Sequence, residues 1–168
     1  GEQFAQQIYQ QILGFGEYGF PESHSASFAL LVYVSAWLKC HEPAAFCAAL
    51  LNSQPMGFYS PSQLVQDAQR HGVEVRPADA LASEWDCTLE TDAMPSGGQP
   101  AVRLGLRMVR GLSQAGAERL VLARRESFDS FEQLALRAQL DRRDLECLAH
   151  ADALRHVTGH RRLALWEV

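Results

Sequence analysis

A run of almost wholly apolar residues near the N-terminus constrains the fold of this chain most. From Phe28 to Leu38 only Ser35 is polar, and a helix that is apolar on nearly every side belongs inside a core. The run is far shorter than the ~20 residues that a helix needs to cross a bilayer. The sequence therefore predicts a buried helix, with no membrane partner.

Polar residues cluster directly before this run. Glu22, Ser23, His24 and Ser25 lie at the predicted helix N-terminus, where unpaired backbone N–H groups and the positive end of the helix dipole favour anions such as phosphate. Ser23 and His24 are therefore candidate phosphate contacts. The alternative for His24 is a helix cap or a hydrogen-bond donor in the core.

The charge of the chain is unevenly distributed. The net charge is -5 over 168 residues. Residues 1–100 carry 3 Lys or Arg against 11 acids, a net charge of -8, and residues 101–168 carry 12 Arg against 9 acids, a net charge of +3. Arginine binds phosphate oxygens bidentately, so the bias suits phosphate contact, although a GC-rich genome would produce it without any functional reason.

Cysteine and histidine usage indicates no metal site. The four cysteines are scattered, without a Cys-x-x-Cys pair or a preceding secretory signal, which is typical of reduced thiols in a cytoplasmic protein. No histidine pair recurs with thiol or carboxylate partners at zinc-ligand spacing. The chain begins with Gly1 and enters a helical pattern at once, from which we expect a fragment of a larger protein.

Apolar spacing predicts helices in the first part of the chain. One spans 4–12 and ends at Gly14 and Gly16; a glycine hinge then leads to the apolar helix. The glycines at 14, 16 and 19 satisfy G-x-G-x-x-G, but no strand precedes them, so we do not expect a dinucleotide site. Two more helices are predicted at 44–52, which would form an antiparallel hairpin with the apolar helix, and at 62–71, closed by Gly72.

Beyond Gly72 the apolar residues recur two apart, in three short segments separated by turns, which predicts a small three-stranded β meander. Helical patterns return at 113–125, 130–138, 141–150 and from 159 onward. The expected fold is mostly α with a small β meander. The expected domains are a helical region (1–72), a small β connector (73–105) and a helical bundle (106–168).

Residues 109–120, VRGLSQAGAERL, resemble the hairpin and second helix of a helix-hairpin-helix unit. Such a turn points backbone N–H groups of the hairpin and the next helix at a DNA phosphate, so binding ignores base identity and depends on salt. The usual form has a second glycine where this chain has Ser113. Serine still offers its N–H to the phosphate, and its hydroxyl could cap the next helix or reach the phosphate. The predicted DNA contacts are Arg110, Gly111, Leu112, Ser113 and Arg119; the alternative is a plain helix-turn-helix corner.

A second unit would run from Leu140 through the turn 151–154 to Arg162. Asp152 lies where the motif tends to carry glycine, and a carboxylate directed at a phosphate would repel it. We therefore interpret the second unit as mainly structural, packing against the first in a tandem bundle.

The N-terminal segment carries a more specific resemblance. The residues 18–20 (YGF), 23–25 (SHS), 37–39 (WLK) and 43–46 (PAAF) resemble the late fingers region of the bacterial C-family DNA polymerases, the polymerase III alpha subunits. Replicative members usually carry Asn-Lys where this chain has Pro21-Glu22, and the Pro-Glu form resembles the error-prone, damage-inducible branch.

The resemblance implies a fragment covering the late fingers and a tandem helix-hairpin-helix domain of a polymerase used in translesion synthesis. The fingers part would support the pocket for the incoming deoxynucleotide, with Ser23 and His24 as candidate contacts. Nucleotidyl transfer needs carboxylates that hold two metal ions, and this sequence has no such pair, so we expect Mg²⁺ outside this fragment and an inactive isolated chain.

The partners that the resemblance implies are primer-template duplex DNA, a sliding clamp and accessory mutagenesis factors. An alternative of another class remains open: a non-enzymatic helix-hairpin-helix module that binds DNA or acts as a scaffold.

Overall fold

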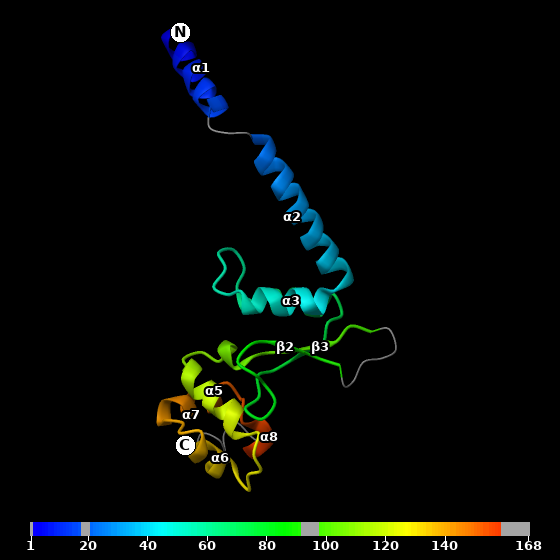
Figure 1. The fold of residues 1–168 in the computed structure, drawn as a ribbon, viewed down its shortest axis with the longest axis vertical. Helices are drawn as coiled ribbons and strands as arrows, with labels where there is room; N and C mark the ends of the chain where they lie inside the picture. The colour runs from blue at the N-terminus through cyan, green and yellow to red at the C-terminus, as the bar shows by residue number, and fades with distance from the viewer. Residues whose placement is uncertain (1, 18–20, 92–97, 159–168) are drawn as a thin grey trace. The chain divides into compact units, whose positions relative to one another are not determined.

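The computed structural model describes residues 2–17, 21–91 and 98–158 (Figure 1). By its internal contacts the chain forms two units, Gly1–Cys40 and His41–Val168. The predicted division into parts at 72 and 105 stays a prediction. Among the described residues, no helix combines the length and the apolarity that crossing a membrane requires.

The first unit consists of helical segments. Helix α1 spans Glu2–Glu17, and helix α2 begins at Pro21 and extends to His41. The expected end of the first helix at Gly14 and Gly16 is therefore wrong: the helix continues through both, at a cost of ~1 kcal/mol for each glycine relative to alanine. The expected hinge falls largely on residues 18–20, which lie outside the described part of the chain.

The apolar helix forms as predicted, but its predicted burial is wrong. The side chains of Phe28 and Tyr33 are 61% and 70% exposed, and the other large apolar residues from Leu30 to Trp37 are exposed as well. The physical reason is the absence of covering layers, since both clusters of buried core residues in the described chain belong to the second unit.

The second unit starts with two helices whose ends are set by local signals. Helix α3 spans Pro43–Asn52, and α4 spans Pro61–Arg70. Each begins with a proline, whose fixed φ suits the first helical position, and the Ser60 side chain caps α4 in a capping box with Gln63. Gly72, at φ +81°, terminates α4 as predicted.

The sheet is three-stranded, but its order differs from a meander. Strands β1 (Val75–Arg76), β2 (Thr88–Glu90) and β3 (Ala101–Arg103) are ordered β1-β3-β2. Strand β3 pairs parallel to β1 and antiparallel to β2. Ala101 and Val102 of β3 are buried, as expected for the central strand of a sheet. The mostly helical class with a small sheet is confirmed.

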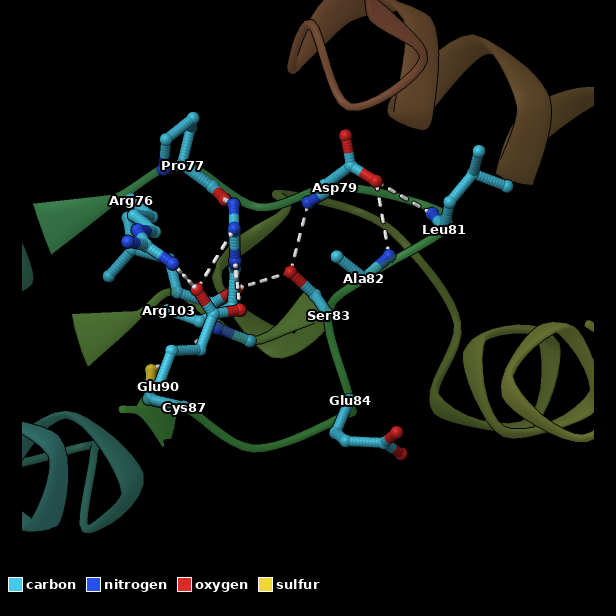
Figure 2. A network of polar contacts seen from close by, with 12 residues as sticks. Arg76, Pro77, Asp79, Leu81, Ala82, Ser83, Glu84, Cys87, Glu90 and Arg103 are labelled. Carbon is cyan, nitrogen blue, oxygen red and sulfur yellow. Dashed lines mark hydrogen bonds and ion pairs between the residues drawn. The ribbon is translucent and has the colours of Figure 1, made fainter. Parts of the chain in front are cut away.

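Polar contacts tie the sheet to the loop that follows β1 (Figure 2). Glu90 on β2 accepts hydrogen bonds from Arg103 on β3, at 2.8 and 3.1 Å, and also pairs with Arg76 on β1. In the loop, the buried Ser83 hydroxyl donates to the Leu104 carbonyl at 2.7 Å and accepts the Asp79 N–H at 2.9 Å. These bonds fix the segment that leads into the helical bundle.

The described part of the bundle contains a short 3-10 helix and four α-helices. Their bounds are Leu106–Met108 for η1, Gln114–Ala123 for α5, Phe131–Arg137 for α6, Arg142–His150 for α7 and Arg155–Thr158 for α8. The caps of α5, α6 and α7 are side chains that accept first-turn N–H groups, namely Ser113, Ser130 and Asp141. Buried leucines from η1, α5, α6 and α7 form its core, together with Leu112 and Leu154. The helix predicted from 159 onward lies outside the described residues.

Candidate nucleic-acid interface

A tight turn, residues 109–113, joins η1 to α5, and we term it the first hairpin. Gly111 lies at φ +87°, in the left-handed region where residues with a Cβ are strained. Leu112 directs its side chain into the bundle core, with 8% exposed, so only its backbone is available to a ligand. Arg110 and Gly111 are exposed.

The first hairpin ends at Ser113, the N-cap of α5. Its hydroxyl oxygen accepts the Gly116 N–H at 3.0 Å. Its own N–H and hydroxyl donate to the two carboxylate oxygens of Asp144 on α7, each at 3.0 Å. The Ser113 N–H is thus already paired within the protein, and Asp144 is a residue of this site that sequence reasoning missed. The only sequence signal was its place in the first turn of α7.

The start of α5 presents donors that are not paired in this way. The N–H groups of Gln114 and Ala115 have no acceptor among the described residues, as expected for the first turn of a helix. Both residues are exposed. Together with the helix dipole, these donors make the end of α5 suitable for an anion.

Arg119 is held within the bundle. Its guanidinium donates to the carbonyls of Ala138 and Gln139, at 2.8 and 3.0 Å, and so satisfies carbonyl groups at the C-terminus of α6. Other arginines of the basic part are used similarly. Arg124 donates to the Ser83 carbonyl at 2.6 Å, and Arg137 to the Ala123 carbonyl at 3.2 Å.

Four exposed arginines keep side chains without a hydrogen-bond or ion-pair partner in the described part of the bundle: Arg110, Arg125, Arg143 and Arg155. Sequence reasoning singled out Arg110 alone. Whether an arginine is paired depends on carbonyl groups that lie far from it in the sequence, and composition does not reveal these contacts.

A second turn, residues 151–154, joins α7 to α8, and we term it the second hairpin. Asp152 has φ +58°, so an acidic residue occupies the backbone conformation that Gly111 has in the first hairpin. Its N–H donates to the Ala149 carbonyl, and the Ala153 N–H donates to the Leu148 carbonyl. These bonds close the end of α7 in a Schellman motif.

The candidate nucleotide contacts lie in the other unit. His24 is exposed in the first turns of α2, and its ring stacks on Phe28 with ring centroids 6.3 Å apart. Ser23 belongs to the same helix, and its side chain lies outside the described part of the structure. The role of both residues in nucleotide binding stays a prediction.

A metal ion or an activated thiol would be a further kind of site within the described residues. No group of three His, Cys, Asp or Glu among its described residues could hold a metal ion, so they do not fit a polymerase's catalytic Mg²⁺ ions. All four cysteines are free. Burial, the largest cause, raises the pKa of Cys47 to about 11, and burial also raises the pKa of Cys87. Both remain thiols at neutral pH and are poor nucleophiles.

Two hairpins, each with a residue of positive φ and each followed by a helix, define a helix-hairpin-helix protein. Residues 72–164 match the helix-hairpin-helix motif family. The chain belongs to the error-prone DNA polymerase family, because it is similar over almost its whole length to curated members. It is 63% identical to the error-prone DNA polymerases of Methylococcus capsulatus and Alkalilimnicola ehrlichii, over 99% of this chain in each case. It is 62% identical to that of Aromatoleum aromaticum over 98% of this chain.

The chain spans only 16–17% of the length of these relatives. The family resemblance found in the sequence, with its error-prone branch, is thereby confirmed. Because the chain covers so little of these relatives, the activity and partners of the whole polymerase remain proposals.

Proposed function

We propose that this chain is the part of an error-prone DNA polymerase that holds duplex DNA by its phosphate backbone, without reading base sequence. The first hairpin carries the proposal. Its turn has Gly111 at φ +87°, the exposed Arg110 stands beside it, and the unpaired N–H groups of Gln114 and Ala115 follow at the start of α5. A phosphate at this position would receive backbone hydrogen bonds and a guanidinium contact together.

The rest of the predicted interface is assigned by role. Gly111 and Leu112 would contribute backbone, and Ser113 would cap α5. Arg119 would act mainly through the C-terminus of α6, to which two of its N–H groups already donate. Arg125, Arg143 and Arg155 would add phosphate contacts that sequence reasoning did not name.

Binding of a fluorescent duplex, followed by anisotropy between 50 and 200 mM salt, tests this proposal. The chain is expected to bind two duplexes of unrelated sequence equally, with an affinity that falls steeply with salt. Arg110→Ala should weaken binding about tenfold and reduce the slope of log affinity against log salt by about 0.9. Arg70→Ala, a change of the same charge at the exposed end of α4, is the matched control and should change neither.

Salt-independent binding by the wild-type chain, or equal binding by the Arg110→Ala and wild-type chains, would rule the first hairpin out as the phosphate contact. The non-enzymatic alternative shares this DNA contact. It is disfavoured by the names of the curated relatives, which are polymerases.

For the whole polymerase we propose template-directed nucleotidyl transfer in damage-induced mutagenesis and translesion synthesis. The carboxylates that hold Mg²⁺ would come from the part of the polymerase beyond this chain. Primer-template DNA and the incoming deoxynucleotide would be its substrates, and a sliding clamp and accessory mutagenesis factors its partners. The start of α2, with Ser23 and His24, would border the nucleotide pocket.

Steady-state incorporation by the full polymerase tests the role of His24. His24→Ala is expected to raise the KM for the incoming nucleotide about tenfold, which corresponds to ~1.4 kcal/mol of lost binding. His150→Ala, at an exposed histidine of α7, serves as the control. An unchanged KM together with an unchanged kcat in His24→Ala would remove His24 from the nucleotide pocket.

A further inference from the structure

A buried carboxylate lies directly behind the first hairpin. Asp144 is 2% exposed, and its two oxygens accept the N–H and the hydroxyl of Ser113, each at 3.0 Å. These bonds join residues 31 positions apart in the sequence. Asp144 is itself held in place at the first turn of α7, where its N–H donates to Asp141 at 2.7 Å.

Helix α7 supports the first hairpin through close contacts. A Cβ at Gly116 would overlap the Asp144 carboxylate and lie 2.7 Å from the Ser113 hydroxyl, and a Cβ at Gly111 would lie 3.1 Å from the Cys147 sulfur. Asp144 and Cys147 are one turn apart on α7. The two glycines therefore allow the hairpin backbone to rest on this face of α7.

We propose that Asp144 is a positioning residue for DNA binding: by pairing with both donors of Ser113, it fixes the first hairpin so that the N–H groups of Gln114 and Ala115 meet a DNA phosphate. This inference rests on the proposed function. It also corrects the expectation that the Ser113 N–H itself reaches the phosphate, since that donor is paired with Asp144.

The charge of Asp144 makes positioning distinguishable from electrostatics. Removal of a carboxylate near the phosphate site takes away repulsion and by itself strengthens DNA binding. Loss of the two bonds to Ser113 leaves the hairpin to be ordered when DNA binds, which weakens binding. The two effects change the affinity for DNA in opposite directions. A variant in which residue 144 has no hydrogen-bond acceptor therefore shows, by whether its affinity rises or falls, which effect is larger.

The test compares three variants of the chain by duplex anisotropy, at a temperature well below the unfolding temperature of each. Asp144→Ala removes both bonds and the charge. Asp144→Asn removes the charge alone, because its amide oxygen accepts the Ser113 N–H and its NH₂ group donates to the hydroxyl oxygen. Asp129→Ala is the matched control: it removes an equal charge from an exposed position between α5 and α6, and the bonds around Asp144 stay in place.

Asp144→Ala is expected to bind DNA about tenfold more weakly than the wild-type chain, despite its more positive charge. Asp144→Asn and Asp129→Ala should bind as well as the wild-type chain or slightly better. If Asp144→Ala does not fold, Asp144→Ser replaces it, because the short serine side chain cannot accept from both donors.

Equal binding by Asp144→Ala and Asp129→Ala, or an equal loss in Asp144→Ala and Asp144→Asn, would overturn the positioning role and leave the proposed function intact. A wild-type chain that binds no duplex DNA would remove the proposed function and this inference with it.

Discussion

Gly105 is the residue at which an added methyl group meets the most rigid surroundings. It is buried at the start of η1, and its N–H points to the Cys87 sulfur at 3.3 Å. A Cβ here would overlap backbone atoms of Trp85 and Asp86. Backbone cannot rotate aside as a side chain can, so overpacking at this position must shift the chain itself.

Gly105→Ala should therefore lower the free energy of unfolding by about 2 kcal/mol or more. The measurement is urea unfolding followed by circular dichroism. Gly57→Ala is the control, since a Cβ at Gly57 meets no atom within 4 Å, and it should change stability by less than ~0.5 kcal/mol. Equal stability of the two variants would show that the backbone between β3 and the first hairpin shifts at little cost in free energy.

At the scale of elements, one carboxylate holds the three strands together. Glu90 on β2 contacts Arg103 on β3 and Arg76 on β1. The hydrogen bonds from Arg103, followed by those from Arg76, hold the pKa of Glu90 below its ordinary value of 4.5. Because the folded pKa is the lower one, the stabilisation is fully present above pH 4.5 and is lost as the pH falls through the folded pKa.

Glu90→Gln should lower the free energy of unfolding by about 1 to 2 kcal/mol at pH 7, because hydrogen bonds to a charged acceptor are lost. Between pH 5 and pH 3 the variant should lose less stability than the wild-type chain. Denaturant unfolding at each pH measures both effects, with Glu118→Gln on the exposed face of α5 as the control. Parallel stability curves for Glu90→Gln and the wild-type chain would exclude Glu90 from the acid response.

The starts of α4, α5, α6 and α7 were predictable because their signals are local. Ser60, Ser113, Ser130 and Asp141 each cap the helix that follows directly, and Gly111 marks its own turn. The strand order was not predictable, since the pairing of Val75 with Val102 joins distant segments. The same limit applies within the candidate site. Ser113 was visible in the sequence as a possible cap, but its contact with Asp144 arises only when α7 packs behind the hairpin.

For the whole molecule, stability is expected to be uneven along the chain. Both clusters of buried residues lie in the second unit, whereas the apolar side chains of α2 are exposed. The apolarity of α2 was readable from the sequence, but whether other residues cover it depends on tertiary packing. Most of the stability of helices in proteins comes from the packing of an apolar face, and α2 lacks such packing.

Hydrogen exchange of the chain, followed by mass spectrometry, tests this division. Amides of residues 24–40 should exchange orders of magnitude faster than those of α3 and α5, because opening α2 disrupts no core, whereas the core helices exchange fully only on global unfolding. The experiment is run at several dilutions, since exposed apolar side chains favour self-association. Protection of α2 that grows with concentration would indicate such association. Protection equal to that of α5 at every dilution would contradict the exposed state, because it would require a covering layer within a single chain.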